Sequence, residues 1–178
     1  GRRGDDLRAV HLQQLPALDV IGRQQQMVRI DFEDAPTETV LRDKLDQFRA
    51  LLPDYDVVIL SDYNKGALVN VADMVREART AGKIVLVDPK GDDFTPYRGA
   101  TILTPNRSEL QRVVGAWKTE EQLTEKAQRL RAELGLTALL VTRSEEGMSL
   151  YSENEVLHVH ADAREVFDVS GAGDTVIA

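Results

Sequence analysis

Two kinds of hydrophobic pattern alternate along the chain. Short apolar runs at residues 56–60, 84–87, 101–103 and 138–141 predict strands, and we expect the β-branched runs to be covered on both faces, as in parallel sheets. Stretches with hydrophobic positions every three or four residues predict helices at 40–52, 70–81, 106–114 and 119–134. This alternation indicates an α/β fold with a mostly parallel central sheet and helices on both faces.

Turn and capping residues set the expected ends of these elements. The capping and stop positions are Pro53, Asn70, Gly82, Asn106, Gly115, Thr119 and Gly135. Residues 147–151 and 155–160 predict a hairpin that turns at 152–154, and residues 20–32 predict one extended strand. Residues 1–19 predict no element, and no repeat or linker divides the chain, so we expect a single domain over 1–178.

Composition excludes several classes of protein. The 178 residues are 42% hydrophobic and 29% charged, as in globular domains, and carry a net charge of −8. An acidic chain is not built to neutralise nucleic acid, and no apolar run is long enough to span a membrane. The chain has no cysteine, so thiolate metal sites are excluded, and a cytoplasmic protein is expected.

Polar residues follow all four predicted strands of the parallel sheet. In open α/β sheets, ligands bind beyond the carboxyl ends of the strands, so these segments are the places to look for chemistry. They are Ser61–Gly66, Asp88–Gly91, Thr104–Glu109 and Thr142–Gly147. We expect the four to converge on one rim of the sheet.

The segment Gly171-Ala172-Gly173-Asp174 carries the clearest chemical signal. Glycines at a helix start leave backbone N–H groups free to hold an anion, and the helix dipole adds positive charge there. A carboxylate at Asp174 can take a proton from an attacking hydroxyl while these amides hold a phosphoryl group. The alternative is an ordinary turn whose Asp174 complements the helix dipole. The segment is neither a lysine-containing phosphate loop nor a dinucleotide fingerprint.

Asp168–Asp174 resembles the carboxy-proximal signature of the PfkB, or ribokinase-like, family of carbohydrate kinases, with Ser170 one place later than usual. Other matching segments are Ser61–Leu68, Asp88–Gly91, Tyr97–Thr101, Leu103–Glu109, Val141–Glu145 and Gly171–Ile177. As an ordered set they are similar to the members that phosphorylate D-glycero-D-manno-heptose 7-phosphate on its anomeric hydroxyl. The resemblance implies a three-layer α/β/α sandwich, ATP and Mg²⁺ as cofactors, Asp174 as catalytic base, and Gly171, Ala172 and Gly173 as the anion hole.

The resemblance also implies a nucleotide side of the site, formed by Asn106, Arg107, Ser108, Glu109, Thr142 and Gly147. Asn106 and Glu109 lie one helical turn apart and would hold Mg²⁺, through water, against the ATP phosphates. A capping box is an alternative for Asn106 and Glu109, and both roles are compatible. A charged hairpin connection is the alternative for residues 142–147.

Four residues are expected on the substrate or phosphate side: Asp62, Lys65, Asp88 and Lys90. The two lysines would screen phosphate as point charges, and the alternative is that they only solubilise the surface.

The expected product is heptose 1,7-bisphosphate, an intermediate of ADP-heptose and lipopolysaccharide core synthesis. Alternatives are a kinase for another sugar or sugar phosphate and a non-catalytic module that binds a nucleotide or a sugar phosphate. The chain starts without Met and stops as a helix opens, so we expect it to lack the family's N-terminal β lid and C-terminal helices. Expected partners are ATP and a sugar phosphate, with no nucleic acid or membrane, in a homodimer.

Overall fold

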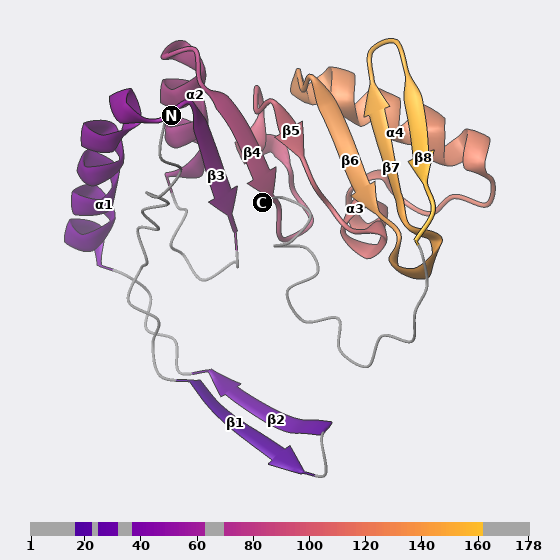
Figure 1. The fold of residues 1–178 in the computed structure, drawn as a ribbon, viewed down its shortest axis with the longest axis horizontal. Coiled ribbons are helices and arrows are strands. Elements are labelled where there is room, and N and C mark those ends of the chain that lie inside the picture. Colours follow the sequence, from indigo (N-terminus) through magenta and orange to yellow (C-terminus); the bar gives the residue numbers. More distant parts are fainter. Residues whose placement is uncertain (1–16, 23–24, 32–36, 63–69, 162–178) are drawn as a thin grey trace, which may run out of the picture. The chain divides into compact units, whose positions relative to one another are not determined.

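The structure is a computed structural model that describes residues 17–22, 25–31, 37–62 and 70–161 (Figure 1). The chain divides into two compact units, residues 1–36 and 37–178, which are described separately. A single domain over 1–178 stays a prediction.

The first unit contains an antiparallel pair of strands. β1 is Ala17–Gly22 and β2 is Gln25–Asp31, with Leu18 opposite Ile30 and Gly22 opposite Gln25. The prediction of one extended strand over residues 20–32 is therefore wrong, because the chain reverses within it. The Asn-Gly or Asp-Gly pair that marks a two-residue hairpin is missing from the sequence here. From the sequence we expect the chain to lack the family's β lid. Strands β1 and β2 nevertheless form a small antiparallel pair in the N-terminal part of the chain.

The second unit contains a six-stranded sheet whose strands follow one another in chain order. The strands are β3 Val57–Ser61, β4 Ile84–Asp88, β5 Ile102–Leu103, β6 Ala138–Thr142, β7 Met148–Ser152 and β8 Val156–Val159. Neighbours from β3 to β6 are parallel, whereas β7 and β8 are antiparallel. The predicted α/β sheet with a terminal hairpin is confirmed.

The helices begin and end close to the predicted residues. They are α1 Glu38–Leu51, α2 Val71–Thr80, α3 Arg107–Val114 and α4 Glu120–Leu134, with short 3₁₀ turns η1 Leu52–Asp54, η2 Thr95–Tyr97 and η3 Ser144–Glu146. Thr119 caps α4 and Gly135 ends it in the left-handed conformation. Asn70 stands at the start of α2, but its side chain makes no capping hydrogen bond there. No helix in the described ranges is long and apolar enough to cross a bilayer.

One face of the sheet forms the hydrophobic core together with the helices. Leu60, Val87, Leu103, Val141 and Tyr151 from the strands are buried in the same cluster as side chains of α2, α3 and α4. The helical residues are Val71, Val75, Ala78, Leu110, Leu123, Ala127, Leu130 and Leu134. Since successive strand residues point to opposite faces, alternate residues of β3 to β7 face this core, whereas all four residues of β8 are exposed.

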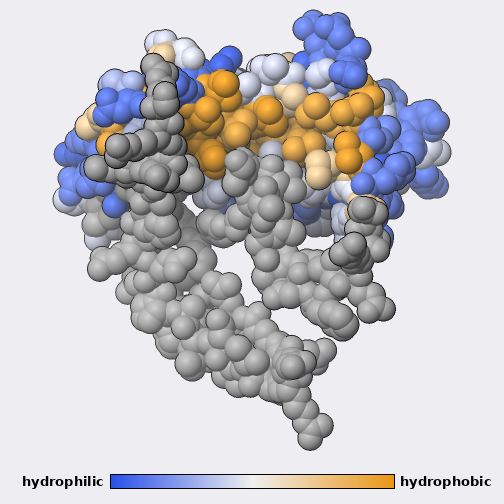
Figure 2. Space-filling view, in the orientation of Figure 1, coloured by the Kyte–Doolittle hydropathy of each residue, from blue (hydrophilic) through white to orange (hydrophobic). Residues whose placement is uncertain are grey.

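The opposite face of the sheet carries exposed apolar side chains. Val57 is 44% exposed and Ile59 and Ile84 are each 46% exposed, and β8 adds Leu157 and Val159, which pair with Leu150 and Met148 on this face. Figure 2 shows these strands as a hydrophobic band across the sheet. Among the described residues, the expectation that β3 and β4 are covered on both faces does not hold, because α2, α3 and α4 contribute to the core on one face only.

Candidate active site at the carboxyl ends of the strands

The carboxyl ends of the parallel strands lie on one edge of the sheet, the lower edge in Figure 1. Asp62 directly follows β3, Asp88 ends β4, and Lys90 lies two residues further on. Asn106 follows β5, and Thr142 ends β6. The structure therefore brings together the described residues that the sequence placed on one rim.

Asp62 and Asp88 lie beside each other at the ends of β3 and β4. The backbone N–H of Asp62 donates to the carbonyl of Asp88 at 2.9 Å. The hydroxyl of Tyr97, from η2, donates to Oδ2 of Asp62 at 2.7 Å. Tyr97 is only 2% exposed, and burial together with this hydrogen bond raises the pKa of its hydroxyl. The hydroxyl therefore remains a donor at neutral pH.

Sequence reasoning missed Tyr97 as a residue of this rim. It lies 35 positions from Asp62 along the chain, in a turn without regular periodicity. Tyr97 does belong to the segment Tyr97–Thr101, which is one of the segments that resemble the family, but the resemblance assigned no role to it.

Lys90 forms an ion pair with a buried carboxylate. Its Nζ lies 2.7 Å from Oε1 of Glu109, whose side chain is 4% exposed, against 32% for Lys90. A buried carboxylate needs a partner to stay ionised without a large cost. Lys90 is therefore not a lysine that only solubilises the surface, and that alternative is wrong for it.

Asn106 and Glu109 form the capping box that the sequence allowed. Asn106 Oδ1 accepts from the backbone N–H of Glu109 at 2.9 Å and from the Ser108 hydroxyl at 2.8 Å. Glu109 Oε2 accepts from the backbone N–H of Asn106 at 2.8 Å. The cap is therefore confirmed.

The same oxygens are those expected near Mg²⁺. Glu109 uses Oε1 for Lys90 and Oε2 for the cap, so a nearby ammonium opposes direct metal coordination at this carboxylate. No group of three His, Cys, Asp or Glu side chains among the described residues is placed to hold a metal. The oxygen donors are of the kind that suits Mg²⁺, and contacts through its water ligands stay a prediction.

The two segments expected on the nucleotide side lie next to each other. Asn106 and Thr142 form a parallel β-bridge, and the N–H of Thr142 donates to the carbonyl of Pro105 at 3.0 Å. The N–H of Arg143 donates to the carbonyl of Gly147 at 2.8 Å and closes the turn after β6. The α3 cap and this turn therefore form one continuous part of the rim.

Ion pairs hold this turn in place. The Arg143 side chain is 11% exposed, and its guanidinium binds both carboxylate oxygens of Glu120 at 2.6 and 2.8 Å and also pairs with Glu146. Arg107 binds Glu146 at 2.7 Å, and its guanidinium lies 5.8 Å from the centre of the Trp117 ring. These ion pairs agree with the alternative of a charged hairpin connection, which accounts for Arg143. A nucleotide role for Arg107 stays a prediction.

Gly147 has a structural reason to be glycine. Its φ is 91°, and a Cβ at this position would lie 2.0 Å from the carbonyl oxygen of Val159. The backbone at the end of β8 therefore occupies the space that any side chain would need. A nucleotide role for Gly147 or Thr142 stays a prediction.

The catalytic segment expected from the sequence lies outside the described residues. This applies to Gly171, Ala172, Gly173 and Asp174, and also to Lys65. Their roles stay predictions.

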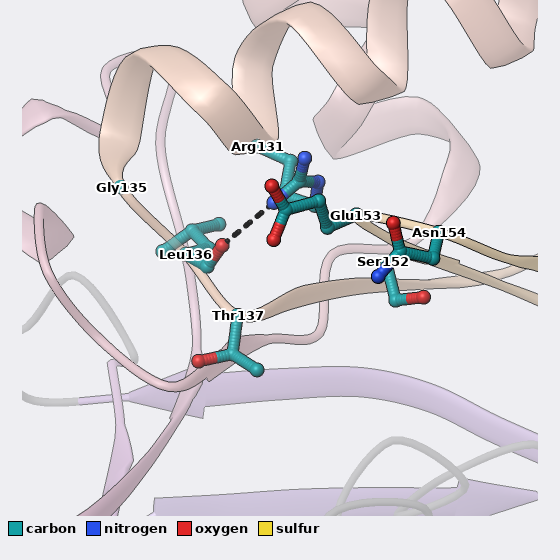
Figure 3. A pocket seen from close by; sticks show the side chains of 7 residues that line it. All are labelled: Arg131, Gly135, Leu136, Thr137, Ser152, Glu153 and Asn154. Atoms are coloured by element: carbon teal, nitrogen blue, oxygen red, sulfur yellow. Dashed lines mark hydrogen bonds between the residues drawn. The ribbon is translucent and has the colours of Figure 1, made fainter.

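A shallow cavity of about 420 Å³ lies at the opposite end of the sheet (Figure 3). Its lining comes from the end of α4, the start of β6 and the β7–β8 turn, and includes Arg131, Thr137 and Glu153. Arg131 donates to the carbonyl of Leu136 at 3.1 Å and to Gln128 at 2.8 Å. None of the predicted site residues that the structure describes lines this cavity.

The family described as pfkB family carbohydrate kinase matches residues 20–178. The chain belongs to this family. The D-beta-D-heptose 7-phosphate kinase of Bordetella bronchiseptica is 52% identical over 159 residues, which are 89% of this chain and 51% of that protein. The bifunctional protein HldE of Shewanella amazonensis is 55% identical over 162 residues, which are 90% of this chain and 34% of that protein. The chain thus spans between a third and a half of these two pfkB relatives.

Solved structures support the fold. Arabidopsis thaliana ribokinase, solved with ribose and ATP, superposes with a TM-score of 0.62 at 21% identity, covering 85% of this chain and 50% of that one. Phosphofructokinase-2 from Escherichia coli gives a TM-score of 0.66 at 16% identity, covering 84% and 51%. These similarities confirm the ribokinase-like fold of this pfkB chain.

Proposed function

We propose that this chain is part of a kinase that transfers the γ-phosphoryl group of ATP to the anomeric hydroxyl of D-glycero-D-manno-heptose 7-phosphate. The products are heptose 1,7-bisphosphate and ADP. The observation that carries the proposal is the 52% identity, over 89% of the chain, to a protein named D-beta-D-heptose 7-phosphate kinase.

The division of the rim into two halves supports this function. Asp62 and Asp88 lie at the ends of β3 and β4, whereas Asn106 and Thr142 lie together beyond β5 and β6. We assign the first half to the sugar phosphate and the second half to ATP. The Lys90–Glu109 ion pair joins the loop after β4 to α3, and we assign it a place beside the transferred phosphoryl group.

The chemical step assigned to this site is an in-line displacement. Asp174 takes the proton from the anomeric hydroxyl as its oxygen bonds to the γ-phosphorus and the bond to the ADP oxygen breaks. The backbone N–H groups of Gly171, Ala172 and Gly173 hold the negative charge on the phosphoryl oxygens.

Mg²⁺, when bound, neutralises charge on the ATP phosphates. Asn106 and Glu109 would hold it through its water ligands, since their own oxygens accept hydrogen bonds within the protein. They would orient those waters, and the pairing with Lys90 fixes the orientation of the Glu109 carboxylate.

The wider setting follows from the same function. We place the kinase in the cytoplasm, where ATP is available, in the ADP-heptose route to the lipopolysaccharide core. We assign it a homodimeric state.

The test is ADP release by the full-length protein with Mg²⁺-ATP and heptose 7-phosphate, compared with fructose 1-phosphate, ribose and no sugar. Heptose-dependent release is the expected result. ADP release that is stimulated only by another sugar would show that this sugar, and not heptose 7-phosphate, is the substrate. ATP binding without sugar-dependent release would show a non-catalytic binding module.

A further inference from the structure

Tyr97 links the ends of two strands at the sugar-phosphate half of the rim. Its hydroxyl donates to Asp62 Oδ2 at 2.7 Å, and the backbone N–H of Lys90 points to the same hydroxyl at 3.4 Å. The hydrogen bond to Asp62 joins η2 to the residue after β3, and the contact with Lys90 joins η2 to the loop after β4.

The contact has the features of a positioning interaction. A hydrogen bond to a carboxylate is shorter and stronger than one between neutral groups, and the 2.7 Å distance is in that range. Tyr97 is 2% exposed, and its ring lies 6.0 Å from the ring of Phe94, so packing of the ring holds the hydroxyl in place. A carboxylate held in this way offers its oxygens in a fixed direction to the hydroxyl groups of a sugar.

Among the described residues, the Tyr97 hydroxyl has no hydrogen bond to the nucleotide half. Its polar partners belong to the segments after β3 and β4, whereas Asn106 and Thr142 pair with each other. Loss of the Tyr97 hydroxyl should therefore change sugar binding and leave ATP binding unchanged.

We propose that Tyr97 is a positioning residue for the sugar phosphate and acts by orienting the Asp62 carboxylate. The proposal rests on the proposed kinase function, because it assigns Asp62 to the sugar half of that site.

The test is Tyr97→Phe in the full-length protein, which removes one oxygen and keeps the buried ring. Tyr151→Phe is a matched control. Tyr151 is also fully buried, in β7, and among the described residues its hydroxyl has no hydrogen-bond partner. The measurements are kcat, KM for both substrates, and calorimetric binding of heptose 7-phosphate without ATP.

We expect Tyr97→Phe to raise KM and Kd for heptose 7-phosphate about tenfold, equivalent to about 1.4 kcal/mol. KM for ATP should stay within about twofold, and Tyr151→Phe should behave as wild type. In an Asp62→Asn background, Tyr97→Phe should have no further effect on sugar binding, because Tyr97 acts through that carboxylate.

Three results would overturn the proposal. Unchanged sugar KM and Kd in Tyr97→Phe would make the hydrogen bond purely structural, and an equal rise in both KM values would mean a general loss of site geometry. Additive effects of the Asp62 and Tyr97 variants would show that Tyr97 does not act through Asp62. Failure of the proposed function is visible separately, because wild type itself would then show no heptose-dependent ADP release.

Discussion

Lys90 Nζ lies 2.7 Å from Glu109 Oε1, and this ion pair joins the loop after β4 to the first turn of α3. Glu109 also closes the capping box with Asn106 through its other carboxylate oxygen. One buried carboxylate therefore connects the two halves of the rim. Its cationic partner, Lys90, is only partly buried.

Lys90→Met should destabilise the protein by about 1–3 kcal/mol, because it leaves a buried carboxylate without its cation. Urea unfolding measures this loss. Lys118→Met is the control, since Lys118 is exposed and should cost less than about 0.5 kcal/mol. Equal small effects of the two variants would show that the ion pair contributes little.

Gly147→Ala should be strongly destabilising, by about 3 kcal/mol or more, because the new Cβ would meet the Val159 carbonyl at 2.0 Å. Gly82→Ala is the matched control. Gly82 also has a positive φ, 74°, but nothing lies within 4 Å of its Cβ position, so only the backbone strain of about 1 kcal/mol applies. A similar loss in thermal and urea stability for both would argue against the close approach of β8.

Asp174→Asn should reduce kcat by about 10²–10⁴-fold, because the amide cannot take the proton from the sugar hydroxyl. ATP binding should persist, since the charge lost is not one that attracts phosphate. Single-turnover kinetics and calorimetric ATP titration measure the two effects. Near-normal turnover would remove Asp174 as the base.

The Arg49–Glu77 pair, which joins α1 to α2 with contacts of 2.9 and 2.7 Å, should make stability depend on pH. The hydrogen bond from Arg49 is the main cause that lowers the pKa of Glu77. A lowered folded-state pKa stabilises the protein above the unfolded value of about 4.3, and this contribution is lost as pH falls through the folded-state pKa.

Arg49→Gln measures this contribution by comparison with wild type. The variant should be less stable than wild type at pH 7, and the difference should shrink as the pH falls from about 5 to 3. High salt should reduce it as well, because the pair is at the surface. A difference that stays constant across this pH range would show that Arg49 acts through packing alone.

Much of the fold follows from local signals. Apolar runs such as residues 84–87 predict strands because their length and β-branched side chains suit a sheet interior. The start of α3 can also be predicted from the sequence, because Asn106 and Glu109 have the spacing of a capping box, whose two residues lie within one helical turn. Convergence of the strand ends on one rim followed from parallel order alone.

The tertiary structure decided which residues pair across the rim and which face of the sheet is covered. Tyr97 meets Asp62 across 35 positions, and Lys90 meets Glu109 across 19, so no local period links them. Likewise, alternate residues of β3 point to opposite faces of the sheet, but the sequence does not determine which of the two faces the helices cover. By itself the sequence determined the elements and the chemistry available after each strand, because these depend on neighbouring residues. The partners of Tyr97 and Lys90 depend on how distant segments pack, which only the folded chain determines.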